Sequence, residues 1–214
     1  MTDWSTLERA ASALRRLNRA VNSHYASDTD LHEIAEHADR LAAAIEPGDR
    51  RDKQVDMMSR PHLARIYNGE YAPLDIADGD EIEFDPFSPI AGIFHPHAIG
   101  LRFFRAGDGV IGRAEVGPGN AGPPNRIHGG VVASLIDETM GALNRSHGRR
   151  AFTASLTVDY RAPAPIDEPV EFRATTISHE GRKIVLSCVG SAPDGTIFCE
   201  SQGLFIQPAE DYQA

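Results

Sequence analysis

The residues of this chain whose types and spacing could do chemistry are His128, Gly129, Gly130 and Asp137. Two adjacent prolines precede them, and this stretch cannot be helical, because proline lacks an N–H donor and restricts the residue before it. If a helix begins at the glycines, the unpaired N–H groups of its first turn are accessible. Such groups favour an anion or a developing oxyanion. The sequence therefore indicates a helix N-terminus that could polarise a carbonyl.

The helix that would position the aspartate is indicated by apolar residues at helical spacing. These are Val131, Val132, Leu135, Ile136, Met140 and Leu143. A second face carries Gly130, Ala133, Asp137 and Gly141, small residues apart from one carboxylate. This pattern alone is also compatible with plain architecture, in which the aspartate is solvated or caps a neighbouring loop.

The distance along this helix limits how the site can be built. Asp137 lies nine residues after His128, which is about 13 Å along a helix. One substrate carbonyl cannot touch both groups of the same chain. If both act in one site, we expect the helix N-terminus of one subunit to meet Asp137 of another, which makes a dimer part of the mechanism.

Composition and charge narrow the class of protein. Of the 214 residues, 41% are hydrophobic and 24% charged, as in ordinary globular proteins, and no apolar run is long enough to span a membrane. The net charge of −10 argues against nucleic acid or an anionic membrane as a partner. A phosphate-bearing ligand would need basic residues concentrated locally. The N-terminal stretch lacks a signal-peptide core, so we expect a cytoplasmic location.

Metal and redox chemistry are not indicated. Cys188 and Cys199 lie in strand-like stretches without metal spacing, and they are typical of small buried apolar residues. His95 and His97 flank a proline, but no carboxylate or further histidine is spaced to complete a ligand set. We expect no metal site and no cofactor.

The N-terminal third is predicted to be helical. Apolar residues three or four apart predict amphipathic helices over 3–22 and 30–45, and a short helix is expected near 61–67. We expect a helical extension and connector over 1–75 and the main domain over 76–214. The extension could pack on that domain, cover a substrate entrance or mediate assembly.

The second of these helices shows a start signal. Asp30 and Glu33 resemble a capping arrangement. The stretch 84–101, rich in proline and glycine, is expected to be an ordered loop.

The rest of the chain is predicted to be antiparallel strands around the glycine-led helix. Short turns at Glu180-Gly181 and Asp194-Gly195 join the last three strands, which must therefore be antiparallel. Phe152, Ala154, Leu156 and Val158 alternate and are expected to share one face. The predicted strands are 101–105, 110–116, 151–161, 170–178, 183–191 and 196–206. Two strands, one helix and four strands indicate an α+β domain.

This order resembles the hotdog fold, in which a curved antiparallel sheet of about six strands wraps a long central helix. His-Gly-Gly followed by Asp137 is similar to acyl-CoA thioesterases of the PaaI type, and most similar in motif to animal thioesterase superfamily members four and five. The resemblance covers about 98–206. The further shared motifs are Gly122-Pro123-Pro124, Ile136-Asp137, Thr153-Ala154 and Glu180-Gly181-Arg182-Lys183.

The resemblance implies a role for each residue of the helix and its neighbour. Asp137 would be the catalytic carboxylate, acting as a general base on water or as a nucleophile. Gly129 and Gly130 would supply the N–H donors that polarise the thioester carbonyl. His128 would shape the loop and could contact the carbonyl. Thr153 would orient Asp137 or the water.

Substrate-binding residues are implied in the same way. Asp159, Tyr160 and Arg161 match the strand end that meets coenzyme A, and Arg182 and Lys183 match a basic turn. One departure is Gly122, where many bacterial relatives carry an asparagine. Asn125 lies nearby and is a further substrate-binding candidate.

The function implied is hydrolysis of an acyl-CoA to a free acid and coenzyme A, without metal or redox cofactor, by a homodimer or a dimer of dimers. Two alternatives stay open. One is a hotdog module that binds acyl-CoA without turnover. The other is a hydratase acting on enoyl-CoA, which needs a paired aspartate and histidine that the strand-rich half lacks. Acyl chain length, and aromatic or aliphatic preference, are not determined.

Overall fold

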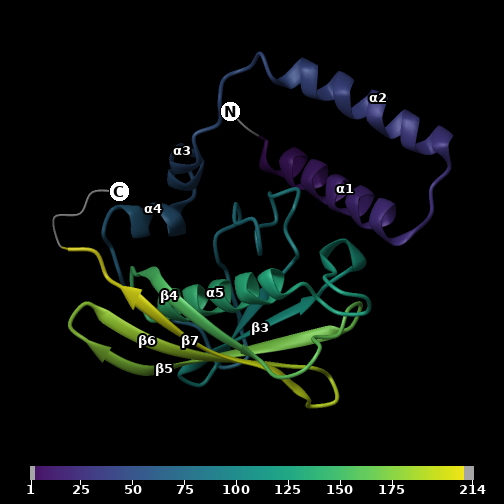
Figure 1. Ribbon diagram of the computed structural model, residues 1–214. Helices are drawn as coiled ribbons and strands as arrows, with labels where there is room; N and C mark the ends of the chain where they lie inside the picture. Colours follow the sequence, from purple (N-terminus) through teal and green to yellow (C-terminus); the bar gives the residue numbers. More distant parts are fainter. Residues whose placement is uncertain (1–2, 210–214) are drawn as a thin grey trace.

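A computed structural model describes residues 3–209. One seven-stranded antiparallel sheet curves around the long helix α5 (Gly129–Ser146), as Figure 1 shows. The strand order is β1-β2-β3-β5-β6-β7-β4. The strands are β1 (Glu81–Ile82), β2 (Arg102–Ala106), β3 (Gly109–Glu115), β4 (Phe152–Tyr160), β5 (Pro169–Glu180), β6 (Lys183–Ser191) and β7 (Ile197–Ile206). This is the predicted hotdog arrangement, with one additional short strand, β1.

The core lies between α5 and the concave face of the sheet. Gly203 of β7 lets the helix approach closely, since a Cβ there would lie 2.7 Å from Met140 Sδ. The apolar residues of α5 with at most 1% exposure are Val132, Leu135, Ile136, Met140, Ala142 and Leu143. Burying these side chains is the main stabilisation of α5, because apolar area removed from water contributes about 25 cal/mol per Å². The predicted apolar stripe of this helix is confirmed.

Strand β4 follows α5 in sequence but lies at the edge of the sheet. It pairs only with β7, from Phe152 opposite Ile206 to Tyr160 opposite Cys199. Seven of its nine residues are exposed. An exposed edge strand offers unpaired backbone groups to another strand, so β4 is a surface that a second chain could pair with.

The N-terminal helices lie on the open side of α5, away from the sheet (Figure 1). They are α1 (Trp4–Ser23), α2 (Asp28–Ile45), α3 (Lys53–Met58) and α4 (Pro61–Tyr67), and a short 3-10 helix, η1 (Pro118–Asn120), follows β3. Helix α3 was not predicted, because six residues are too short for a periodic pattern. The domain boundary near residue 75 stays a prediction.

Helix α1 is attached to the loop 84–101 by a small aromatic cluster. The ring of Trp4 stacks on Phe94 at 5.4 Å and meets the edge of Phe87 at 5.6 Å. Arg15 donates to the carbonyls of Ile93 and His95, each at 2.9 Å. Backbone hydrogen bonds within the loop confirm that it is ordered.

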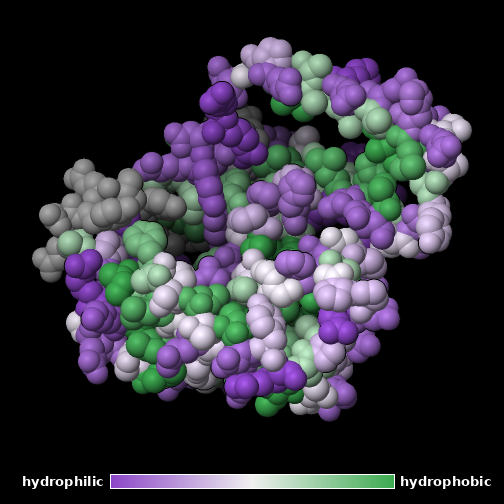
Figure 2. Space-filling view, in the orientation of Figure 1, coloured by the Kyte–Doolittle hydropathy of each residue, from purple (hydrophilic) through white to green (hydrophobic). Residues whose placement is uncertain are grey.

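Helix α2 has no buried residue and projects from the body of the molecule. Its predicted cap was wrong in detail. Ser27 is the N-cap, accepting from the Asp30 N–H at 3.1 Å and donating to the Asp30 carboxylate at 2.6 Å. Ser27 and Asp30 have the spacing of a capping box, whereas Glu33 lies one turn too far along the helix. Exposed apolar side chains of α1 and α2 contribute to the green areas of Figure 2. Within residues 3–209 no helix is long and apolar enough to cross a bilayer.

Candidate active site

The N-terminus of α5 leaves one N–H group of its first turn open. His128 is the N-cap, and its Nδ1 accepts from the Gly130 N–H at 3.0 Å. The N–H groups of Val131 and Val132 donate to the His128 carbonyl at 2.9 and 3.0 Å. Within the described residues, no group accepts from the Gly129 N–H. Gly129 therefore presents the donor that a ligand could use, while Gly130 N–H is taken by the cap.

Tyr160 at the end of β4 holds this terminus in place. Its hydroxyl donates to the Gly129 carbonyl at 2.7 Å. Burial raises the pKa of Tyr160, and the Cys199 thiol adds to this, so the phenol stays protonated as a donor. A groove of about 390 Å³ lies beside the terminus, and its lining includes Gly129, Val132, Tyr160 and Arg161.

The loop before α5 fits closely around His128. A Cβ on Gly122 would lie 3.0 Å from the His128 Cα. Gly122, at the position where many bacterial relatives carry an asparagine, therefore permits close packing of the loop against His128. Asn125 has φ of 63°, a left-handed conformation that asparagine tolerates better than most residues. It is exposed near the tip of a narrow turn. A backbone hydrogen bond from the Gly122 N–H to the Arg126 carbonyl, 3.1 Å long, closes this turn.

Asp137 lies in the middle of α5 and contacts β4. Its Oδ1 accepts from the Thr153 hydroxyl at 2.7 Å. Asp137 is half-buried and Thr153 is exposed. The predicted pairing of these two side chains is thus present, although they are 16 residues apart in sequence. One carboxylate oxygen is oriented by Thr153, which leaves Oδ2 for a water molecule or a substrate.

A β-bulge aims Thr153 at the helix. Thr153 pairs with Phe205 and Ser155 with Leu204, so Ala154 is an extra residue on β4. Side chains alternate in a regular strand, and one inserted residue reverses the alternation. The expected common face of Phe152, Ala154, Leu156 and Val158 was therefore wrong, since Thr153 rather than Ala154 lies on the α5 side. An isolated Thr-Ala pair does not reveal a bulge.

A second carboxylate beside the first was not predicted. Glu138 accepts from the hydroxyl of Ser88, which is 3% exposed. Burial raises the pKa of Glu138, and the negative charges of Asp85 and Asp137 act in the same direction. This contact ties the loop 84–101 onto α5 next to the catalytic candidate. No local signal could have found it, because 50 residues separate the partners.

The candidate residues form two groups at opposite ends of β4. The Gly129 N–H lies at the Tyr160 end, and Asp137 lies at the Thr153 end. Thr153 lies opposite Phe205 and Tyr160 opposite Cys199, six positions apart on β7 and therefore about 20 Å. Gly129 and Asp137 are eight residues apart on α5, about 12 Å along its axis. Within one chain the proposed carbonyl donor and the carboxylate do not converge.

The predicted coenzyme A contacts are divided in the same way. Arg161 donates to Glu200 at 2.9 Å and to Asp159 at 3.4 Å, at the Gly129 end. Arg182 donates to the Gln207 carbonyl at 2.7 Å. Lys183 pairs with Ile206 in the sheet, at the Thr153 end. The two basic groups would come together only if a second chain were present.

The remaining side chains with possible chemistry are two cysteines and a pair of histidines. Cys188 and Cys199 are buried, as expected, and burial raises the pKa of both thiols, that of Cys199 to about 11. The rings of His95 and His97 lie 5.9 Å apart. No cluster of three or more potential metal ligands occurs among the residues that the structure describes.

Comparison with known proteins supports the motif argument. Residues 125–199 match the family model described as "Thioesterase superfamily". Acyl-coenzyme A thioesterase THEM4 of Bos taurus is 36% identical over 92 residues, which is 42% of this chain and 38% of that protein. Acyl-coenzyme A thioesterase THEM5 of Homo sapiens is 32% identical over 87 residues, 40% of this chain and 35% of that protein. This chain therefore matches well under half the length of these relatives.

The fold extends the likeness over nearly the whole chain. A crystal structure of a thioesterase superfamily protein superposes with a TM-score of 0.73 and 25% identity over 94% of each chain, which must include most of the N-terminal helices. The hotdog fold is confirmed. The resemblance to superfamily members four and five, predicted from the motifs, is confirmed as well.

Proposed function

We propose that this protein hydrolyses acyl-CoA thioesters to a free acid and coenzyme A. The observation that carries the proposal is the Asp137 carboxylate oriented by Thr153, on a helix whose first turn leaves the Gly129 N–H open. The relatives that match the chain around these residues are named acyl-coenzyme A thioesterases. A carboxylate and an N–H donor suffice for attack by water on a thioester.

The proposed reaction balances without another reactant. Asp137 Oδ2 takes a proton from a water molecule while the oxygen of that water attacks the thioester carbon. The carbonyl oxygen becomes an oxyanion and accepts from the Gly129 N–H. When the intermediate collapses, the C–S bond breaks and the coenzyme A sulfur takes the proton from Asp137. Thr153 holds the carboxylate in position throughout and is a positioning residue.

The site is proposed to be shared between two protomers. The edge strand β4 is exposed, and two such strands can pair antiparallel across a two-fold axis. With the axis near Leu156 and Thr157, Thr153 of one protomer would lie opposite Tyr160 of the partner subunit. Asp137 would then meet Gly129 of the partner subunit, which removes the separation of about 12 Å. A further pairing of dimers into a tetramer remains part of this proposal.

Coenzyme A would bind along this shared edge. Arg182 and Lys183 from one protomer would approach Asp159, Tyr160 and Arg161 of the partner subunit. Cations gathered in this way would meet the requirement for local positive charge in an acidic protein, because phosphate groups bind guanidinium and ammonium groups through charge-assisted hydrogen bonds.

The cytoplasmic location also stays a prediction.

The decisive experiment is thiol release from acyl-CoAs ranging from acetyl to palmitoyl, with phenylacetyl and benzoyl, by the wild type and Asp137→Asn. We expect the variant to lose at least about 10²-fold in kcat, the lower end of general-base contributions. Asp39→Asn, on exposed α2, is the matched control. Full activity in a folded Asp137→Asn protein would refute the mechanism. Tight coenzyme A binding without any hydrolysis by the wild type would instead indicate a binding module.

A further inference from the structure

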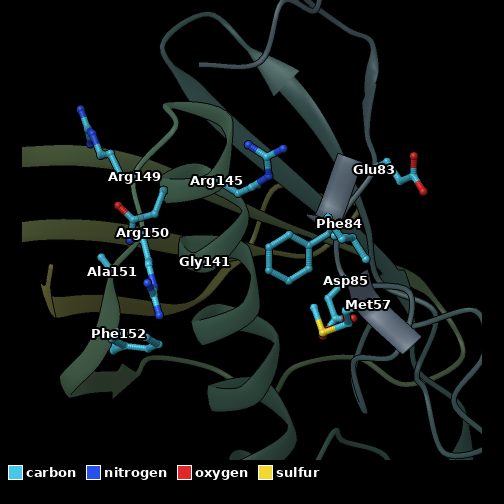
Figure 3. A pocket seen from close by; sticks show the side chains of 12 residues that line it. Met57, Glu83, Phe84, Asp85, Gly141, Arg145, Arg149, Arg150, Ala151 and Phe152 are labelled. Carbon is cyan, nitrogen blue, oxygen red and sulfur yellow. The ribbon is translucent and has the colours of Figure 1, made fainter. Parts of the chain in front are cut away.

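A cavity of about 320 Å³ lies between α5 and the N-terminal segments (Figure 3). It includes Gly141, one helical turn beyond Asp137 and about 6 Å along the helix axis. A Cβ at Gly141 would meet Phe84 at 3.5 Å, so glycine leaves this space open. Much of the wall is apolar and comes from α3, α4, the segment after β1, and the start of β4 with the residue before it: Met57, Leu63, Phe84, Phe152 and Ala151. An acyl group next to the carboxylate could enter it.

The far end of this cavity contains an amide without hydrogen-bond partners. Asn144 lines the cavity and is 2% exposed. Neither its Nδ2 nor its Oδ1 has a partner within the described residues. A buried polar group left unpaired costs about 1–3 kcal/mol, and most such groups in native proteins are paired. Asn144 therefore indicates that a ligand reaching this end of the cavity carries a polar group.

A guanidinium lies next to this amide. Arg145 also lines the cavity and is half-buried, and its guanidinium forms no ion pair or hydrogen bond with the side chains and backbone that the structure describes. Burial lowers its pKa, and the charge of Arg65 acts in the same direction. In Figure 3 its side chain lies near the ring of Phe84, which also lines the cavity. An anion bound here would offset the cost of burying the charged guanidinium.

The carboxylates of the cavity wall are engaged by other cations. Asp85 pairs with Lys53 at 2.8 Å, and Glu83 lies 3.7 Å from Arg60. Arg149, another cation of the wall, donates to the Thr176 hydroxyl at 3.1 Å. Arg145 is thus distinguished from these neighbours by lacking a partner among the described residues.

We propose, on the premise that the protein is an acyl-CoA thioesterase, that this cavity selects acyl groups ending in a carboxylate, which Arg145 and Asn144 bind. Arg145 lies eight residues beyond Asp137, about 12 Å along the helix. An extended acyl chain advances about 1.3 Å per carbon, given C–C bonds of about 1.5 Å. The geometry therefore fits a mono-CoA ester of a dicarboxylic acid with about eight to ten carbons.

The test compares thioesters that differ only at the far end of the chain. The kcat/KM of the mono-CoA ester of octanedioic acid is divided by that of octanoyl-CoA, and the ten-carbon pair is treated in the same way. We expect a ratio above one for the wild type. Arg145→Met should lower it about 10- to 100-fold, because a hydrogen bond to a charged group contributes about 1.5–3 kcal/mol. Arg149→Met, the matched control, should keep the ratio within about threefold, a difference below 1 kcal/mol.

Binding measurements separate this inference from the proposed hydrolysis. Calorimetric titration of the same esters into the Asp137→Asn protein reports cavity preference without turnover. A carboxylate preference that depends on Arg145, in a protein without hydrolytic activity, would support the cavity and refute the hydrolysis. Hydrolysis that favours the unsubstituted ester at every length would overturn the cavity proposal alone. If Arg145→Met does not fold, the same ratio of kcat/KM values is measured for Asn144→Leu. In either case, a wild-type ratio that is not above one would overturn the cavity proposal.

Discussion

Replacing Gly129 by proline tests which N–H group acts on the thioester. Gly129 is the first residue of α5, a position where proline is tolerated because its missing N–H has no helical partner. His128 before it has φ of −61° and ψ of 135°, the extended conformation that a residue before proline prefers. The substitution therefore removes one N–H and leaves the backbone of the helix start largely unchanged.

The expected loss follows from the role of that donor. Removing one oxyanion donor costs about 10²–10³ in kcat. Gly129→Ala is the matched control, because it adds the same Cβ, 3.4 Å from the Tyr160 ring and hydroxyl, and keeps the N–H. We expect Gly129→Ala to retain kcat within about tenfold, equivalent to a barrier change below 1.4 kcal/mol. Initial rates of thiol release give kcat, and thermal unfolding confirms that each variant is folded.

Two outcomes would contradict this reasoning. If folded Gly129→Pro keeps full activity, Gly129 does not bind the oxyanion, and the Gly130 N–H must leave the His128 cap during the reaction. If both variants lose activity equally, the added Cβ rather than the missing N–H is responsible.

Three further predictions follow from the same geometry. Thr153→Val removes the 2.7 Å hydrogen bond to Asp137 and should lower kcat about 10- to 100-fold, since a bond to a charged group contributes about 1.5–3 kcal/mol. Thr153→Ser should restore kcat, and equal rates for the two variants would refute the positioning role. Co-expression of Asp137→Asn with Gly129→Pro should recover about a quarter of wild-type activity. Random pairing makes half of the dimers mixed, and one of the two sites in each mixed dimer is intact. No recovery would mean that each site lies within one chain. The pKa of Glu138 is raised above its ordinary value of 4.5, so its contribution to stability is complete below pH 4.5 and is lost as pH rises through the raised pKa. Denaturant titration should show this loss of stability in the wild type and not in Glu138→Gln. Parallel pH profiles of stability for the two proteins would refute the assignment.

Local patterns were sufficient for most of the secondary structure. The long helix and the six longer strands lie close to the predicted ranges, because their periodicities of 3.6 and 2 and their turn glycines act over a few residues. The two-residue strand β1 and the six-residue helix α3 were not predicted, because neither is long enough to show a period. The separation of Asp137 from the helix N-terminus also followed from the sequence, because helical rise converts residue number into distance.

Contacts between distant segments were decided by the tertiary structure alone. The bulge that turns Thr153 toward Asp137 depends on the pairing of β4 with β7, and the Ser88–Glu138 contact depends on how the loop 84–101 folds over α5. The cavity that ends at Asn144 and Arg145 combines α5, β4 and the N-terminal segments. In each case the partners meet through burial and pairing across the fold, which leave no periodic signal in either segment by itself. The sequence thus determined which groups could react and on which helix they lie, and the tertiary structure decided which of them are oriented, paired or left open to a ligand.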